Sequence, residues 1–266
     1  MDEITLKKYQ SKLMIDKIFI PELNEERDLY IYLPSTYGYE PLPVLYMFDA
    51  QNMHIKDYSL SGDSWEIPRT IEKKIKEEGS KGYIVVGVAS SNTRRSQEYA
   101  PYKLVSGFYE DEKDNVALAD LMLEFYTNEL KEYVDLNYKT LKDRDNTHLF
   151  GSSFGANISL YGLIVKEEYY NSIGLFSLCL PLISEDFKTH IKEASLKYVH
   201  NIYIVMGSKE DMDKKMNNMI LDDSKFVAST LNNKNQKIYY EIVEGAKHTE
   251  KTWARSFDRF INIIES

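Results

Sequence analysis

The sequence predicts an α/β protein with a mostly parallel sheet of eight strands and helices on both faces, in one domain over residues 1–266. Three observations lead to this fold class. Two segments near the start alternate apolar and polar residues, continuous apolar runs follow, and amphipathic helical segments separate those runs. Strands that alternate with helices are typical of a parallel sheet, and no segment is left over for a large cap domain.

The predicted strands differ in how much of each we expect to be buried. Residues 11–20 and 27–34 alternate, as half-exposed antiparallel strands do. Runs such as VLYMF and YIVVGVA are apolar throughout, which favours central parallel strands covered on both faces. These continuous strands are expected at residues 44–48, 83–89, 147–151, 173–180, 202–207 and 237–245.

Helical periods occupy the intervals between strands. In residues 249–264, Trp253, Phe257 and Phe260 lie on one apolar stripe with Ile261 and Ile264. The other predicted helices cover residues 65–78, 115–136 and 156–165.

Composition and charge argue against several classes of binding partner. Acidic residues give a net charge of −9, with dispersed lysines, so we expect no nucleic-acid binding. The N-terminus lacks a signal-like pattern and no apolar run approaches 18 residues, so we expect a cytoplasmic protein without a membrane partner. The single cysteine, Cys179, excludes an intramolecular disulfide and is interpreted as a small buried hydrophobe. The oligomeric state stays open, a homodimer included.

The strongest local motif is Gly151-Ser152-Ser153-Phe154-Gly155, which fits G-x-S-x-G, the nucleophile elbow. The pattern needs small residues on either side of the serine because the chain turns tightly from strand to helix. THLFG before the motif reads as a strand and ANISLYGLIV after it as a helix. We therefore predict Ser153 as a nucleophile.

A serine nucleophile needs a base and an acid, which in this arrangement follow it as acid and then histidine. His248 follows the last predicted strand, directly before a helix, and is the predicted base. His190 and His200 flank a charged segment and are expected at the surface. Glu210 comes directly after the next-to-last strand and is the first choice for the acid, with Asp211 as the alternative.

Two further regions are candidates for the site. The oxyanion hole needs two backbone donors, which we expect from Phe154 and from Gln51 or Asn52, while Asp49 makes structural hydrogen bonds in that loop. Residues 90–114 form a long aperiodic connection at the carboxyl end of a central strand, interpreted either as a substrate-facing wall or as a packing loop. The candidate substrate contacts are His54, Trp65, Arg95, Tyr99 and Tyr102, and the same connection also holds Arg94, Phe108 and Tyr109.

At these motifs the chain resembles a known family, the esterase D-like "Putative esterase" family of α/β-hydrolases. The likeness spans roughly residues 10–264, in the segments VLYMFDAQNMH, YIVVGVASSNTRRSQEYAPY, LKDRDNTHLFGSSFGANISLY, IVMGSKED and VEGAKHTEKTW. Ala50 and Ala156 stand where the family usually has glycine. The segment from Arg95 to Tyr102 is most similar to the siderophore-esterase and carbohydrate-esterase branch. The resemblance implies an α/β-hydrolase fold and a triad of Ser153, His248 and Glu210 or Asp211.

The residues and the resemblance together predict a serine esterase that hydrolyses small-molecule carboxylic esters through an acyl-enzyme, with neither metal nor organic cofactor. An acyltransferase of the same fold and a trilactone siderophore esterase are the alternatives. Arg94 and Arg95 would suit an anionic ester, and the aromatic residues of the long connection would suit a short acyl or acetylated-sugar ester.

Overall fold

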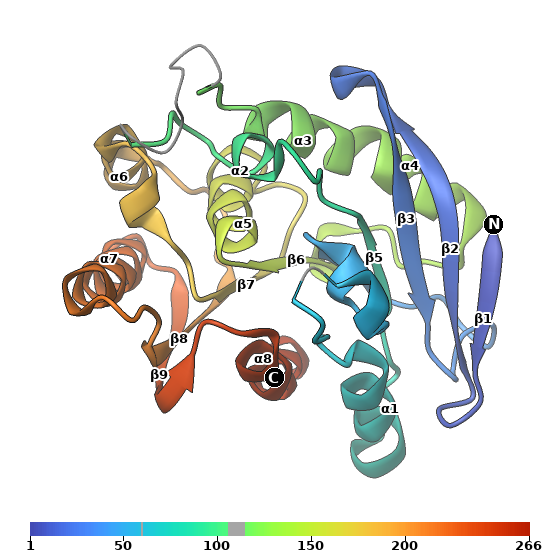
Figure 1. Cartoon of the computed structure of the whole chain (residues 1–266). Helices are drawn as coiled ribbons and strands as arrows, with labels where there is room; N and C mark the ends of the chain where they lie inside the picture. The colour runs from blue at the N-terminus through green and yellow to red at the C-terminus, as the bar shows by residue number, and fades with distance from the viewer. Residues whose placement is uncertain (60, 106–114) are drawn as a thin grey trace.

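In the part of the chain that the structure describes, one sheet holds nine strands (Figure 1). A computed structural model describes residues 1–59, 61–105 and 115–266. The spatial order is β1-β2-β3-β5-β4-β6-β7-β8-β9, antiparallel as far as the β3/β5 pair and parallel beyond it. The strands are β1 (Asp2–Leu6), β2 (Ser11–Ile20), β3 (Glu25–Leu33), β4 (Val44–Met47), β5 (Ile84–Val88), β6 (Thr147–Ser152), β7 (Ser172–Phe176), β8 (Asn201–Lys209) and β9 (Lys237–Lys247).

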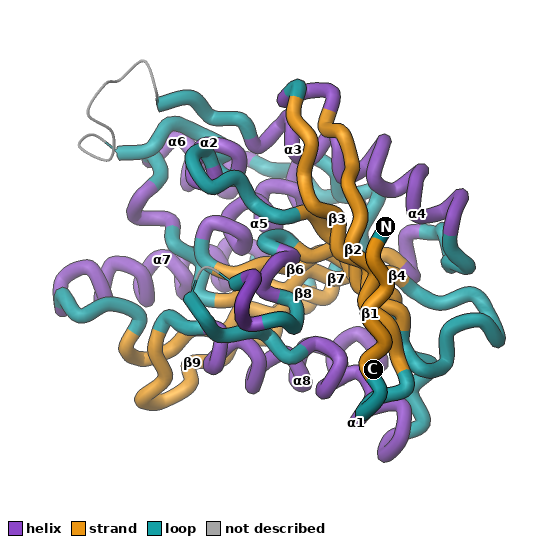
Figure 2. Tube along the Cα trace, turned by 45° about the vertical axis from the view of Figure 1, so that its right-hand side comes forward, coloured by secondary structure: helices purple, strands orange, loops and turns teal. Residues whose placement is uncertain are grey.

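The predicted fold class is confirmed, but the predicted count of eight strands is one short. The additional strand is β1, which pairs with β2 at the edge of the sheet. Its residues DEITL are exposed or half-buried, so burial imposes no apolar pattern on them. Figure 2 shows the twist of the sheet: β1, β2 and β3 rise steeply in that view, whereas β6, β7 and β8 lie across it.

Helices cover both faces of the sheet (Figure 1). α1 and α8 pack on one face, with Ile71, Phe257 and Phe260 in the same apolar cluster as inward residues of the strands. α3, α4, α5 and α7 contribute to the cluster on the other face. The helices are α1 (Ile67–Glu78), α2 (Arg95–Glu98), α3 (Ala119–Phe125), α4 (Lys131–Asn137), α5 (Phe154–Val165), α6 (Glu185–Glu193), α7 (Lys214–Asn232) and α8 (Glu250–Glu265), with the π-helical segment η5 (Tyr126–Leu130) joining α3 to α4.

Short 3₁₀ helices occupy several connections: η1 (Pro21–Leu23), η2 (Ala50–Asn52), η3 (Lys56–Tyr58), η6 (Arg144–Asn146) and η7 (Leu180–Leu182). The long connection after β5 contains the short helix α2. Phe108 and Tyr109, later in the same connection, lie outside the described residues. Within the described ranges no helix combines the length and the apolar character that a bilayer span requires.

The carboxyl ends of β4 to β8 meet at one edge of the sheet, because these five strands are parallel to one another. The turns that leave this edge contain the elbow, the η2 loop, Ser177 and Glu210. Side chains far apart in the sequence are thereby brought to one place in the fold.

Candidate active site

Ser153 occupies the tight turn between β6 and α5. Its backbone angles are φ 57° and ψ −123°, a conformation that residues other than glycine rarely adopt. The turn is held by the Ser153 N–H, which donates to the carbonyl of Phe176 at 2.9 Å. The Ser153 carbonyl in turn accepts from the N–H groups of Ala156 and Asn157, which starts the helix. The half-buried serine is thus fixed at the carboxyl edge of the sheet.

The two glycines of the motif differ in how much room the structure leaves for a side chain at their positions. A Cβ atom on Gly151 would lie 2.5 Å from the carbonyl oxygen of Gly155, which is backbone and cannot move aside cheaply. A Cβ atom on Gly155 would meet Phe48 Cβ at 3.3 Å and an Asp49 carboxylate oxygen at 3.4 Å, close to ordinary contact. The steric requirement for glycine is therefore stronger at position 151.

Glu210 and His248 form a direct pair. Oε2 of Glu210 lies 2.7 Å from Nδ1 of His248, and Oε1 accepts the Ser177 hydroxyl at 2.7 Å and the backbone N–H of Gly207. The Glu210 side chain is fully buried, while that of His248 is 28% exposed. The neighbouring Asp211 is exposed and accepts the N–H of Asp213 instead. Of the two predicted acids, the structure brings Glu210 to the imidazole.

Ser177 connects this pair to the elbow and to α8. It follows Phe176, whose carbonyl accepts the Ser153 N–H, and it adopts φ 50° while fully buried. Its hydroxyl accepts the indole N–H of Trp253 at 2.8 Å and donates to Glu210. The Trp253 ring packs edge-on against His248, with centroids 5.2 Å apart. One series of contacts thus runs from the elbow through Ser177 and Glu210 to the imidazole.

The η2 loop follows β4 at the same edge. Asp49 begins it in the left-handed conformation, with φ 58°, and its carbonyl accepts the N–H of Asn52 at 2.9 Å. The Gln51 side chain exchanges two hydrogen bonds with Ser90, at 2.8 and 3.1 Å. Because the Asn52 N–H is already donating, Gln51 is the better of the two predicted oxyanion donors. As expected, Asp49 makes structural bonds here.

The predicted substrate contacts lie in different surroundings. Trp65 is 1% exposed and packs against aromatic side chains that include Trp253, and Tyr99 is fully buried against Phe48. Each of these two rings has almost no surface for a ligand. The Tyr102 hydroxyl lies 2.9 Å from Nδ1 of His190, on α6.

His54 and Arg95 complete the predicted set. His54 is half-buried with its ring edge-on to Tyr9, and burial holds its pKa below the ordinary value, which favours the neutral imidazole. The guanidinium of Arg95 forms a bidentate pair with the Asp49 carboxylate. Arg94 pairs with Glu25, so both arginines already contact carboxylates.

Two other buried titratable groups, Cys179 and His148, are held in their neutral forms. Burial, with a smaller contribution from Glu210, raises the pKa of the Cys179 thiol to about 12, which keeps it protonated. Burial lowers the pKa of His148 to about 3. His200 was expected at the surface, which is wrong: it is fully buried, because it directly precedes β8 and its ring lies between Gln236 and the Glu167 carbonyl.

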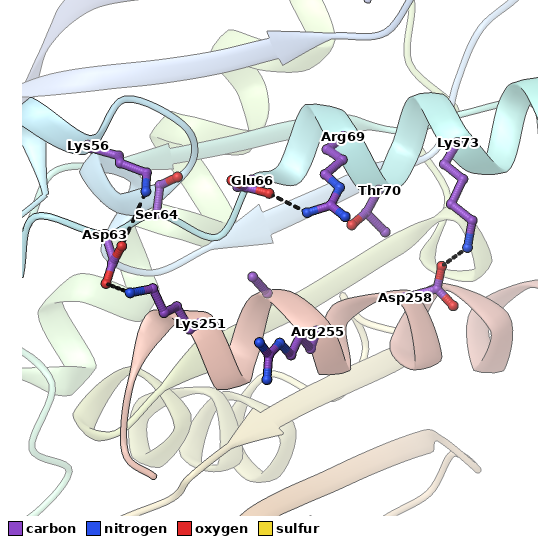
Figure 3. A pocket seen from close by; sticks show the side chains of 11 residues that line it. Lys56, Asp63, Ser64, Glu66, Arg69, Thr70, Lys73, Lys251, Arg255 and Asp258 are labelled. Atoms are coloured by element: carbon purple, nitrogen blue, oxygen red, sulfur yellow. Dashed lines mark hydrogen bonds and ion pairs between the residues drawn. The ribbon is translucent and has the colours of Figure 1, made fainter. Parts of the chain in front are cut away.

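Charged side chains line a groove of about 420 Å³ between α1 and α8 (Figure 3). Asp63 lies between Lys56 and Lys251, at 3.3 and 3.2 Å, and Lys73 pairs with Asp258. These ion pairs are largely exposed, so each contributes little to stability. Among the described residues no cluster of His, Cys, Asp or Glu side chains is arranged to hold a metal ion.

Sequence reasoning missed Ser177 and Trp253 as parts of the site. A positional signal existed for Ser177, which directly follows β7, the strand beside β6. Trp253 was assigned only to the apolar stripe of α8, and its N–H needs a partner when the ring is buried.

Comparison with protein-family models matches residues 20–261 to the family described as "Putative esterase". The chain belongs to this family. It is a carboxylic ester hydrolase, and the resemblance read from the sequence motifs is confirmed.

Solved structures share the fold of this esterase, and a relative from Bacillus subtilis is similar to it in sequence. The protein YjcH of Bacillus subtilis (strain 168), described as uncharacterized, is 28% identical over 208 residues, which are 77% of each chain. The siderophore hydrolase EstA from Aspergillus nidulans superposes with a TM-score of 0.76 at 14% identity, covering 96% of this chain and 95% of that one. A CE1 ferulic acid esterase from Anaeromyces mucronatus gives 0.67 at 22% identity, covering 94% and 89%. At these structural identities the likeness shows the fold.

Proposed function

We propose that this esterase cleaves carboxylic esters through an acyl-enzyme on Ser153, with His248 as general base and Glu210 as the acid that orients it. The observation that supports this most is the 2.7 Å bond between Glu210 and Nδ1 of His248, joined through Ser177 to the strained turn of Ser153. A carboxylate on Nδ1 fixes the tautomer in which Nε2 can accept a proton.

The reaction follows from these roles. The Ser153 hydroxyl attacks the ester carbonyl while Nε2 of His248 takes its proton, which gives a tetrahedral oxyanion. Collapse of this intermediate breaks the bond to the alcohol, which leaves with the proton from His248. Water, deprotonated by His248, then attacks the acyl carbon; the bond to Ser153 Oγ breaks, His248 returns the proton to that oxygen, and the acid is released.

The developing negative charge needs donors in place before the reaction. We assign them to the backbone N–H of Phe154, at the start of α5, and of Gln51, in the η2 loop. The amino end of α5 adds the positive end of its helix dipole at the same place.

The substrate class within esters is a finer proposal. Structural neighbours described as a siderophore hydrolase and as ferulic acid esterases support a siderophore ester, of the trilactone class that the sequence resemblance raised, or an ester of ferulic acid as candidates. Hydrolysis rates over a panel of siderophore, feruloyl and short acyl esters, with an added alcohol to detect acyl transfer, would rank them. The cytoplasmic location stays a prediction for cell fractionation to test, and light scattering would measure the oligomeric state, which the sequence leaves open.

The test of the proposed function is the hydrolysis of p-nitrophenyl acetate. Ser153→Ala is expected to lower kcat/KM by at least about 10³-fold, as loss of a nucleophile does in serine hydrolases. Ser229→Ala, which removes an exposed hydroxyl on α7, is the matched control and is expected to keep the wild-type rate. Equal rates for wild type and Ser153→Ala would refute the nucleophile assignment.

A further inference from the structure

We infer that Arg95 and Tyr99 hold the η2 loop in the conformation that presents its oxyanion donor, so that Arg95 is a positioning residue and not an anchor for anionic substrates. This inference rests on the proposed function, because it concerns the loop to which that proposal assigns the Gln51 donor. It also replaces the role of substrate contact that the sequence suggested for Arg95 and Tyr99.

The ion pair between Arg95 and Asp49 has the geometry of a rigid link. Nε of Arg95 donates to Oδ1 of Asp49 at 2.7 Å, and Nη2 donates to Oδ2 at 2.6 Å. The Asp49 side chain is 3% exposed and that of Arg95 is 26% exposed. Two parallel bonds from a planar guanidinium fix both the position and the rotation of the carboxylate, which a lysine ammonium cannot do.

Tyr99 holds the same residue through its backbone. The Asp49 N–H donates to the Tyr99 hydroxyl at 3.2 Å, and the Arg95 guanidinium lies over the Tyr99 ring, 5.3 Å from its centroid. Tyr99 is itself immobilised, because it is fully buried and packs edge-on against Phe48. α2, through Arg95, and the residue that follows it, Tyr99, therefore contact the side chain and the main chain of Asp49.

Asp49 needs such support because of its conformation. Its φ of 58° lies in the left-handed region, which is unfavourable for a residue other than glycine. The η2 turn that follows depends on it, since the Asp49 carbonyl accepts the Asn52 N–H. Gln51, the proposed donor, lies inside this turn, and its side chain is tied to Ser90. A relaxed Asp49 would rotate the donor away from the oxyanion.

The charge of Arg95 is already used inside the protein. Burial acts to lower the pKa of its guanidinium, but the Asp49 carboxylate outweighs burial, with a smaller contribution from Glu250, and the net pKa is raised. Glu250 begins α8, two residues after His248. An anionic substrate would have to compete with the bidentate carboxylate of Asp49.

Steady-state kinetics of Arg95→Lys with two esters separates positioning from anion binding. One ester is neutral, p-nitrophenyl acetate, and the other carries a carboxylate, p-nitrophenyl hemisuccinate. If Arg95 is a positioning residue, kcat should fall by about 10- to 100-fold for both esters, because a misplaced catalytic group causes a loss of that size. KM should change less than about twofold for either ester. A rise in KM for the hemisuccinate alone, with kcat unchanged, would overturn the inference.

The matched control is Arg144→Lys. Arg144 also forms an ion pair and lies over a tyrosine ring, that of Tyr198, but it precedes β6 at the opposite edge of the sheet. It is expected to keep the wild-type kcat for both esters. An equal loss of kcat in both variants would mean a general loss of stability and would count against positioning.

Asp49→Asn breaks the ion pair between Arg95 and Asp49 at its other member. It keeps the inference testable if Arg95→Lys folds poorly. The double variant is expected to lose no more kcat than the worse single variant, because both changes break one interaction. If the losses of kcat in the two single variants multiply in the double variant, a shared role is contradicted.

Ser153→Ala distinguishes failure of the proposed function from failure of this inference. An active Ser153→Ala would refute the proposed function. An inactive Ser153→Ala together with a normal kcat in Arg95→Lys would refute only this inference.

Discussion

The hydroxyl of Ser177 donates to Oε1 of Glu210 at 2.7 Å, the oxygen opposite the one that contacts His248. Ser177 in turn accepts the indole N–H of Trp253 at 2.8 Å. A buried carboxylate that is bonded on both oxygens keeps one orientation, and it thereby fixes the orientation of the imidazole bonded to it. The pair is therefore positioned by β7 and α8 together.

Replacing Ser177 should slow catalysis. Loss of a hydrogen bond to a charged group costs about 1.5–3 kcal/mol, so Ser177→Ala is expected to lower kcat/KM about 10- to 150-fold. Ser177→Gly loses the same bond, but glycine adopts φ 50° without strain, so it should be more stable than Ser177→Ala. Ester hydrolysis and thermal unfolding of both variants test this. Activity that follows stability, with Ser177→Gly close to wild type, would rule out the orienting role.

Substitution of the two acidic residues distinguishes the candidates for the acid. Glu210→Gln keeps the size but loses the charge beside His248, and kcat is expected to fall about 10³- to 10⁴-fold. Asp211→Asn should change kcat less than about twofold, because that exposed carboxylate bonds Asp213 and not the imidazole. The measurement is kcat for p-nitrophenyl acetate, and the reverse order of effects would assign the acid to Asp211.

The two glycines of the elbow should tolerate alanine differently. Gly151→Ala puts a methyl group 2.5 Å from the backbone oxygen of Gly155, and we expect a loss of about 3 kcal/mol in the free energy of unfolding. Gly155→Ala meets its neighbours at 3.3 Å or more and adds helix propensity, so we expect a change below about 1 kcal/mol. Urea unfolding measures both, and equal losses would contradict the steric account.

His148 should make stability depend on pH. Its folded pKa is about 3 because of burial, whereas an unfolded histidine titrates near 6.5, so the unfolded chain binds more protons between these values. The contribution of His148 is fully present above pH 6.5 and is lost as the pH falls toward 3, by about 2 kcal/mol at pH 5.

The control for this dependence is His148→Phe, which cannot titrate. Its free energy of unfolding in urea should fall less between pH 7 and pH 5 than that of the wild type, by about 2 kcal/mol. The same dependence in both proteins would show that other groups cause it.

Much of the fold could be predicted from the sequence because burial leaves a pattern. VLYMF and YIVVGVA are apolar throughout because β4 and β5 are covered on both faces. β1 left no such pattern, since an exposed edge strand can hold polar residues. The helix α7 was not predicted either, despite its length. It is half-exposed, and asparagine and aspartate interrupt its apolar stripe.

The site was predictable to the extent that its parts follow strands. Ser153, Glu210 and His248 each lie within three residues of the end of a predicted strand, and parallel strands end at one edge. The pairing of Arg95 with Asp49 could not be predicted, because two residues 46 positions apart meet only after the sheet has formed. Trp65 illustrates the same limit: nothing local in the sequence distinguishes a core indole from one that lines a pocket.

Covalent labelling tests the central claim most directly. A fluorophosphonate reacts with an activated serine, and digestion followed by tandem mass spectrometry locates the adduct. The account predicts one adduct per chain, on Ser153, and none on Ser153→Ala. An adduct on any other residue, or equal labelling of Ser153→Ala, would contradict it.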